Sequence, residues 1–151
     1  MPTKTNEVNI RFVSNSISHT SIAGHQIRTL TERHICDWLN AHGITHQHAS
    51  DIFIVKAAAN GSPQLFVPDI TLKRKTRNGR SIIVESLHSF SPKRGGMKAL
   101  HAFHRQYHDQ FYIMLVGKRA ALENLPKGVA DARNDLENLD GLARKLAKLM
   151  S

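Results

Sequence analysis

Two acidic residues, Asp69 and Glu85, lie within apolar segments that otherwise resemble buried strands. A buried carboxylate costs free energy unless a positive partner compensates it. The two segments are separated by a short basic stretch containing Asn78-Gly79, a strong hairpin signal, so the strands are expected to be neighbours. Two carboxylates on adjacent strands favour a shared cation, and a metal ion is the leading candidate.

A third carboxylate, Glu32, belongs to a segment with helical periodicity that runs from about residue 26 to residue 42. At 100° per residue Glu32 falls about 20° from Leu39 on the apolar arc, because seven residues nearly complete two turns. Glu32 is therefore expected to lean toward the surface on which the helix packs, the alternative being a solvated glutamate at the helix edge. Three converging carboxylates would suit Mg²⁺ or Mn²⁺. Such an ion can activate water for attack on a phosphodiester.

The charge of the chain favours a polyanionic partner. Lysine and arginine number 21 against 12 aspartate and glutamate residues, which gives a net charge of +9. Nucleic acid is the first candidate, an anionic membrane surface the second, and a merely basic protein the alternative. Several basic residues flank the two carboxylates in sequence and are expected to hold backbone phosphates: Lys73, Arg74, Lys75, Arg77, Arg80, Lys93 and Arg94.

Composition predicts one folded domain spanning residues 1–151. The chain is 40% hydrophobic and 22% charged, which argues against disorder. No apolar run is long enough to cross a membrane, and the N-terminus lacks the apolar region of a signal peptide. The single cysteine, Cys36, fits a reducing compartment, so a cytoplasmic location is expected. We expect Cys36 to be a small buried side chain inside the helix over 26–42, with a reactive thiol as the alternative.

The order of the expected elements predicts the fold. After a short strand over 8–14 come the helix over 26–42, strands over 51–57, 66–72 and 81–88, a helix over 97–109 and a strand over 111–116. The last strand is a continuous apolar run, which is typical of a strand covered on both faces. The sequence therefore predicts an α/β fold, a three-layer sandwich with a central mixed sheet and an αβββαβ core.

The part of the chain beyond this core, residues 118–151, is expected to be a helical extension. Apolar residues recur at spacings of three and four from Val129 to Met150, which is a heptad-like stripe. Packing of this helix on its own domain is the preferred interpretation. A homodimer or a partner protein bound through the helix over 129–150 is the alternative.

Three histidines, His42, His46 and His48, are expected in a polar loop. A zinc site formed by these three would have no cysteine support, so it is not the preferred interpretation.

The combination of a helix-borne Glu32, Pro68-Asp69 and a strand carrying Glu85 resembles the PD-(D/E)xK nuclease superfamily. This restriction-endonuclease-like fold also occurs in archaeal Holliday-junction resolvases, very-short-patch repair nucleases and transposon end-cleaving nucleases. The resemblance covers residues 32–117, the expected nuclease-like core being about 26–117. It implies a metal-dependent endonuclease that hydrolyses DNA in preference to RNA. Asp69 and Glu85 would bind Mg²⁺ or Mn²⁺, with Glu32 as an auxiliary ligand.

One position departs from the family pattern. The signature lysine, which orients the attacking water, is replaced by Leu87. The lysine function could have migrated to Lys98, the favoured candidate, or to Lys93 or Lys56. Otherwise the chain would be a weakened or inactive nuclease-fold protein that serves as a nucleic-acid-binding or assembly module. A third interpretation is an acid cluster held by internal lysine or arginine partners without a metal.

Overall fold

A computed structural model describes residues 19–20, 26–27, 29–56, 62–87 and 94–150 of the chain. Its centre is a five-stranded sheet with strand order β3-β6-β7-β8-β9. The five strands are β3 (His46–His48), β6 (Ile70–Lys75), β7 (Ser81–Leu87), β8 (Phe111–Gly117) and β9 (Ala132–Asp135). The strand expected over 8–14 and the side chains of Lys93 and Arg94 lie outside the described part.

The sheet is mixed. Strands β3, β6 and β7 pair antiparallel, whereas β8 pairs parallel to β7 and β9 pairs parallel to β8. Helix α3 (Arg94–Tyr107) makes the crossover that a parallel β7–β8 pair requires.

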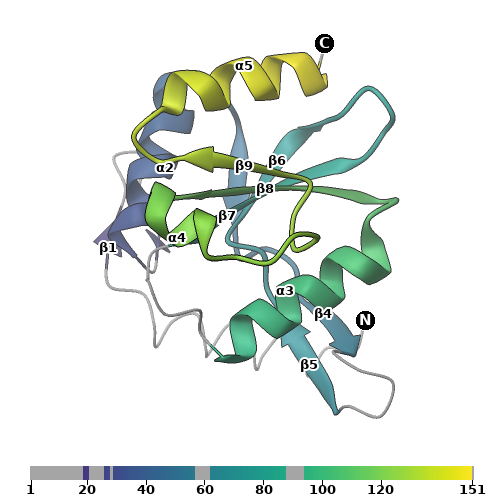
Figure 1. Cartoon of the computed structure of the whole chain (residues 1–151). Helices are drawn as coiled ribbons and strands as arrows, with labels where there is room; N and C mark the ends of the chain where they lie inside the picture. The colour runs from purple at the N-terminus through teal and green to yellow at the C-terminus, as the bar shows by residue number, and fades with distance from the viewer. Residues whose placement is uncertain (1–18, 21–25, 28, 57–61, 88–93, 151) are drawn as a thin grey trace.

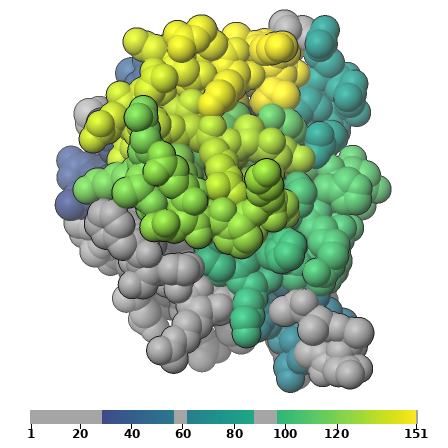
Figure 2. All heavy atoms as spheres, in the orientation of Figure 1, coloured from purple at the N-terminus to yellow at the C-terminus, as the bar shows by residue number. Residues whose placement is uncertain are grey.

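Helices flank both faces of the sheet (Figure 1). On one face, α2 (Leu30–Ala41) and α5 (Leu139–Met150) pack against alternate residues of β6, β7 and β8. On the other face lie α3, α4 (Arg119–Glu123) and a separate hairpin made of β4 (Phe53–Lys56) and β5 (Pro63–Phe66). The space-filling view shows the segment from α4 through β9 over the front of the molecule, with α5 above it (Figure 2). The predicted α/β class with a central mixed sheet is thus confirmed.

Helix α2 begins later than the periodicity predicts. Gln26–Ile27 forms strand β2, paired with β1 (His19–Thr20), and the helix starts at Leu30. The cause is an N-cap, because the Thr29 side chain accepts a hydrogen bond from Glu32 N at 3.1 Å. A threonine followed three residues later by glutamate has the sequence pattern of a capping box, and this local signal sets the start of the helix.

One expected loop and two expected strands differ in the structure. The segment expected to be a polar histidine loop contains β3, the edge strand of the main sheet, which is antiparallel to β6. The strand expected over 51–57 is β4, and it pairs with β5 outside the main sheet. The expected strand over 66–72 is divided, with Phe66 ending β5 and Ile70 beginning β6.

The C-terminal region is not the helix over 129–150 that the apolar stripe predicts, for which Asp140-Gly141 is a possible break. Ala132–Asp135 forms β9, and α5 starts only at Leu139, so Asp140-Gly141 lies in its first turn. Pairing with β8 overrides the weak β-propensity of this strand. Leu142 and Leu146 of α5 are buried against the sheet, so this helix packs on its own domain. Of the helices in the described ranges, none combines the length and apolarity needed to cross a membrane.

Candidate functional site

Asp69 and Glu85 lie side by side where β6 begins and β7 ends. The backbone N–H of Asp69 donates to Glu85 Oε1 at 2.6 Å. In the reverse direction, the backbone N–H and the hydroxyl of Ser86 donate to Asp69 Oδ2 at 2.8 and 2.9 Å. These contacts occupy one oxygen of each carboxylate and fix both acids against the neighbouring strand.

Strand register explains this convergence. Ile70 is the cross-strand partner of Val84, so the residues next to them, Asp69 and Glu85, meet at the same end of the hairpin. Val84 belongs to the core under α2 and α5. Because side chains alternate along a strand, Glu85 points to the opposite face, which is the face covered by α3.

Glu32 has a different described partner. Its Oε2 accepts a hydrogen bond from His48 Nδ1 at 2.7 Å, and the residue is only 2% exposed. Helix α2, which carries Glu32, packs on the face of the sheet opposite to the one toward which Glu85 points. The structure therefore brings Asp69 and Glu85 together and places Glu32 in a second polar cluster.

That second cluster contains Cys36, His46 and His48. Cys36 Sγ lies 3.2 Å from His46 Nε2 and 3.1 Å from His48 Nε2. Within the described part of the chain, this is the one group of three cysteine, histidine or acidic residues whose ligand atoms all lie within 4.8 Å of one another. Cys36 is buried, as predicted from its place in the helix.

The group differs from the histidine set His42, His46 and His48 that the sequence suggested as a less favoured zinc site. His42 is exposed at the end of α2 and its Nδ1 bonds to Trp38 O at 2.8 Å. Cys36 takes its place in the group, because α2 packs against β3. The sequence feature that indicates the pairing of His46 with His48 is their spacing of two, because residues two apart in a strand lie on the same face.

The lysine candidates occupy different places. Leu87 is half-buried at the end of β7 and packs against the core under α3. Lys98 is exposed near the start of α3, and Lys56 is exposed at the end of β4. Because α3 joins two parallel strands, it runs antiparallel to them, and Lys98 lies toward the end of the sheet that carries Glu85.

The basic residues between the strands do not form a rim around the acids. Lys73, Arg74 and Lys75 are exposed on β6, and Arg77 lies in the turn beyond it. The turn is at the opposite end of the hairpin from Asp69, about 20 Å away at roughly 3.3 Å per strand residue.

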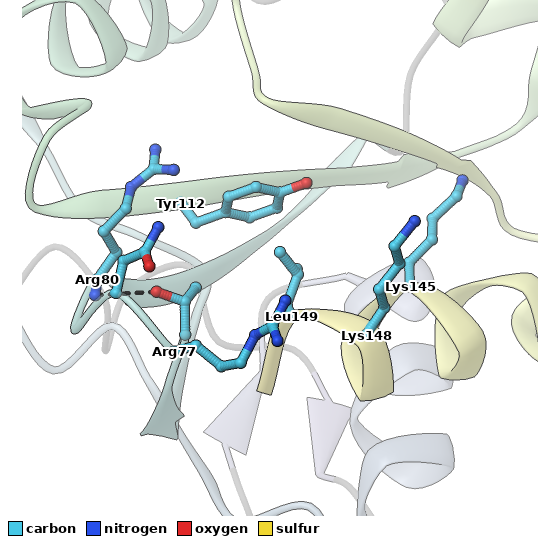
Figure 3. Close-up of a pocket in the computed structure, with 8 residues that line it drawn as sticks. Arg77, Arg80, Tyr112, Lys145, Lys148 and Leu149 are labelled. Carbon is cyan, nitrogen blue, oxygen red and sulfur yellow. Dashed lines mark hydrogen bonds between the residues drawn. The ribbon is translucent and has the colours of Figure 1, made fainter. Parts of the chain in front are cut away.

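At that end the turn and α5 enclose a basic pocket of about 360 Å³ (Figure 3). Four of its side chains are cationic: Arg77 and Arg80 from the hairpin, and Lys145 and Lys148 from α5. Arg80 also donates to Phe111 O at 2.9 Å and lies over the Tyr112 ring, 5.1 Å from its centroid. The pocket therefore combines positive charge with an aromatic wall.

Tyr112 in this pocket offers a spectroscopic probe of its charge. Burial raises the pKa of Tyr112 above 10.0, the Asp131 carboxylate raises it further, and the Arg80 guanidinium lowers it. In a Tyr107→Phe background, ultraviolet titration should show the remaining phenol ionising above pH 10, and Asp131→Asn should lower that midpoint. Since the folded state holds the phenolic proton more tightly, this contribution to stability is present below pH 10 and is lost as the pH rises through the folded-state pKa. An unchanged midpoint in Asp131→Asn would contradict the proposed coupling.

No protein-family model and no curated protein matches this chain. The two polar clusters and the basic pocket are thus the observations from which function is inferred.

Proposed function

We propose that this protein is a Mg²⁺- or Mn²⁺-dependent endonuclease that hydrolyses phosphodiester bonds in DNA. The observation that carries the proposal is the pairing of Asp69 with Glu85 at the junction of two sheet strands. The two carboxylates lie on neighbouring strands, each bonded to the strand of the other, and a divalent cation between them would offset the repulsion of two like charges. Oxygen ligands of this type suit Mg²⁺ and Mn²⁺.

The order of elements supports the same assignment. With the β4–β5 hairpin set aside, the chain runs α2, β3, β6, β7, α3, β8, which is helix, three strands, helix and strand. This is the order expected of a PD-(D/E)xK core, with Pro68-Asp69 before the second strand and Glu85 on the third. The hairpin is then an insertion between the first and second strands.

The residues have separable roles in this proposal. A bound divalent ion would supply Lewis acidity and an activated water. Asp69 and Glu85 would hold it, and their bonds to Ser86 and to the Asp69 backbone keep both carboxylates oriented. Lys98 is the candidate for the missing signature lysine, since it lies toward the Glu85 end of the sheet.

Basic residues at the far end of the hairpin support a polyanionic substrate. A separation of about 20 Å corresponds to roughly six base pairs at 3.4 Å each. Phosphates of a bound nucleic acid could therefore contact cations such as Arg77 and Lys148 at a distance from the bond being cleaved.

The test is a cleavage assay with the full chain on linear, supercoiled and four-way-junction DNA. Cleavage is expected with Mg²⁺ or Mn²⁺, and none is expected with chelator alone or with Ca²⁺, which binds oxygen ligands with looser geometry. Absence of cleavage of all three substrates with both metals would contradict the proposal.

A second candidate is a non-catalytic nucleic-acid-binding module, favoured by Leu87 at the lysine position and by the basic pocket. It predicts binding that weakens steeply with salt and is unchanged by chelator. Salt-sensitive binding without cleavage would select this candidate over the nuclease.

A further inference from the structure

We infer that Cys36, His46 and His48 form a zinc site that fastens helix α2 to the edge strand β3. The inference is independent of the nuclease proposal, because it concerns different residues and a different class of metal. Cys36 is 0% exposed and His46 is 6% exposed, so the group lies inside the protein rather than on its surface. All three ligand atoms lie within 4.8 Å of one another.

The outer hydrogen bonds of the two histidines leave Nε2 of each ring for a ligand on the side of Cys36. His46 Nδ1 bonds to the carbonyl oxygen of Ile44 at 2.8 Å, and a carbonyl can only accept. His48 Nδ1 bonds to a carboxylate oxygen of Glu32 at 2.7 Å. Both imidazoles therefore carry hydrogen on Nδ1, and in their neutral forms both Nε2 atoms present a lone pair.

The Nε2 atoms of both rings lie beside the same sulfur. Nε2 of His46 lies 3.2 Å from Cys36 Sγ, and Nε2 of His48 lies 3.1 Å from it. A metal ion can accept electron pairs from one thiolate and two imidazoles at once. The arrangement is thus the one expected of a metal site.

The surroundings of the histidines match those of metal ligands. A ligating histidine characteristically donates its other N–H to a carboxylate or a backbone carbonyl, which fixes the tautomer and the ring orientation. His48 has the carboxylate of Glu32 in this role, and His46 has the carbonyl of Ile44. This assigns Glu32 a positioning role toward His48.

The ligand types select zinc rather than magnesium. Thiolate and imidazole are soft or borderline ligands that suit Zn²⁺, whereas Mg²⁺ prefers oxygen. With Zn–S near 2.3 Å and Zn–N near 2.0 Å, a tetrahedral ion separates sulfur and nitrogen by about 3.5 Å, close to the contacts present. A fourth position would be filled by water or another residue.

The location suggests what the ion does for the fold. Strand β3 has only three residues, His46–His48, and lies at the edge of the sheet. Its hydrogen bonds to β6 secure one side, and the zinc ion would secure its two histidines to α2. Because the segment after β3 leads to Ala49, whose N–H donates to Asp69 O at 3.2 Å, the ion would also steady the backbone beside the acid pair.

Cobalt provides a test that needs no substitution. Cys36 is the single cysteine of the chain, so thiolate-to-cobalt charge-transfer absorption can come from no other residue. Titrating metal-stripped full-length protein with Co²⁺ should produce this band together with the intense visible bands of tetrahedral cobalt, saturating at about one ion per chain. Zn²⁺ should bleach both bands, whereas Mg²⁺ should not. A folded protein that gives no thiolate band overturns the inference.

Variants then locate the ligands. Cys36→Ser should abolish the charge-transfer band and weaken zinc binding by more than the roughly 10–100-fold expected of Glu32→Gln, which removes only an outer partner. His42→Ala is the matched control, because it deletes a nearby exposed histidine, and it should bind zinc like the unmodified chain. Unchanged zinc affinity in Cys36→Ser, or loss of zinc in His42→Ala, would contradict the assignment. If Cys36→Ser does not fold, the cobalt spectrum of the unmodified chain decides alone.

Discussion

Replacing Asp69 by asparagine is expected to reduce metal-dependent DNA cleavage by at least about 100-fold, the scale on which single charge-stabilising groups act in active sites. Asparagine retains an oxygen that can accept the hydrogen bonds from Ser86, so the local fold should persist while the negative charge is lost. Glu85→Gln should have an effect of similar size for the same reason. Initial rates of supercoiled-plasmid nicking in Mn²⁺, measured on proteins of unchanged circular dichroism, provide the comparison.

The matched control is Glu123→Gln, which makes the same change of charge at an exposed position on α4. It should cleave DNA at the rate of the unmodified chain. If Asp69→Asn and Glu85→Gln also retain that rate, the acid pair is structural and holds no catalytic metal. Zinc content should be unaffected in both acid variants, so failure of the nuclease proposal leaves the zinc inference standing.

The parts of the fold that sequence predicts well are those in which local pattern and tertiary environment agree. The apolar run from Phe111 forms β8, the central strand of the parallel part of the sheet. A strand covered on both faces has apolar residues on both, so its sequence is a continuous apolar run. The predicted turn at Asn78-Gly79 is also present. Gly79 has a φ of 82° there, a conformation that glycine adopts without strain.

The two edge strands of the main sheet are hard to predict because their sequences carry little periodic signal. Strands β3 and β9 have three and four residues, and both are rich in polar side chains. β9 is held by contacts from other segments, such as Lys145 of α5, whose ammonium donates to Arg133 O at 2.6 Å. The apolar stripe over 129–150 continues across β9 because buried residues lie on both sides of that strand. Val129 and Leu146 are both buried, but they pack on opposite faces of the sheet.

The two polar clusters show the same contrast. Asp69 and Glu85 could be paired from sequence because a hairpin fixes the register of its strands. The group of Cys36 with His46 and His48 depends on how α2 packs against β3, and a nine-residue gap between cysteine and histidine does not reveal that packing. The predicted lean of Glu32 toward the packed side of its helix is confirmed, since the residue is 2% exposed, and its described partner there is His48.

The largest expected effect on stability is that of Phe103→Ala. Phe103 is fully buried in α3 and its ring is 4.5 Å from that of Phe66 and 4.9 Å from that of Phe53, which belong to the β4–β5 hairpin. It also packs against Tyr107 and Phe111, with ring centroids 5.0 and 5.2 Å away. Truncation removes this whole set of contacts and leaves a cavity, so the free energy of unfolding should fall by about 3–5 kcal/mol.

Urea titration followed by circular dichroism measures this loss, with Leu65→Ala as the control on the same hairpin. Leu65 is 47% exposed, and its truncation should change the free energy of unfolding by no more than about 0.5 kcal/mol. A loss in Phe103→Ala as small as in the control would mean that the hairpin does not pack on α3. Because only two residues separate Phe66 from Asp69, loosening the hairpin should also loosen the acid pair. We therefore expect Phe103→Ala to lose cleavage activity at a lower temperature than the unmodified chain, in step with its earlier unfolding.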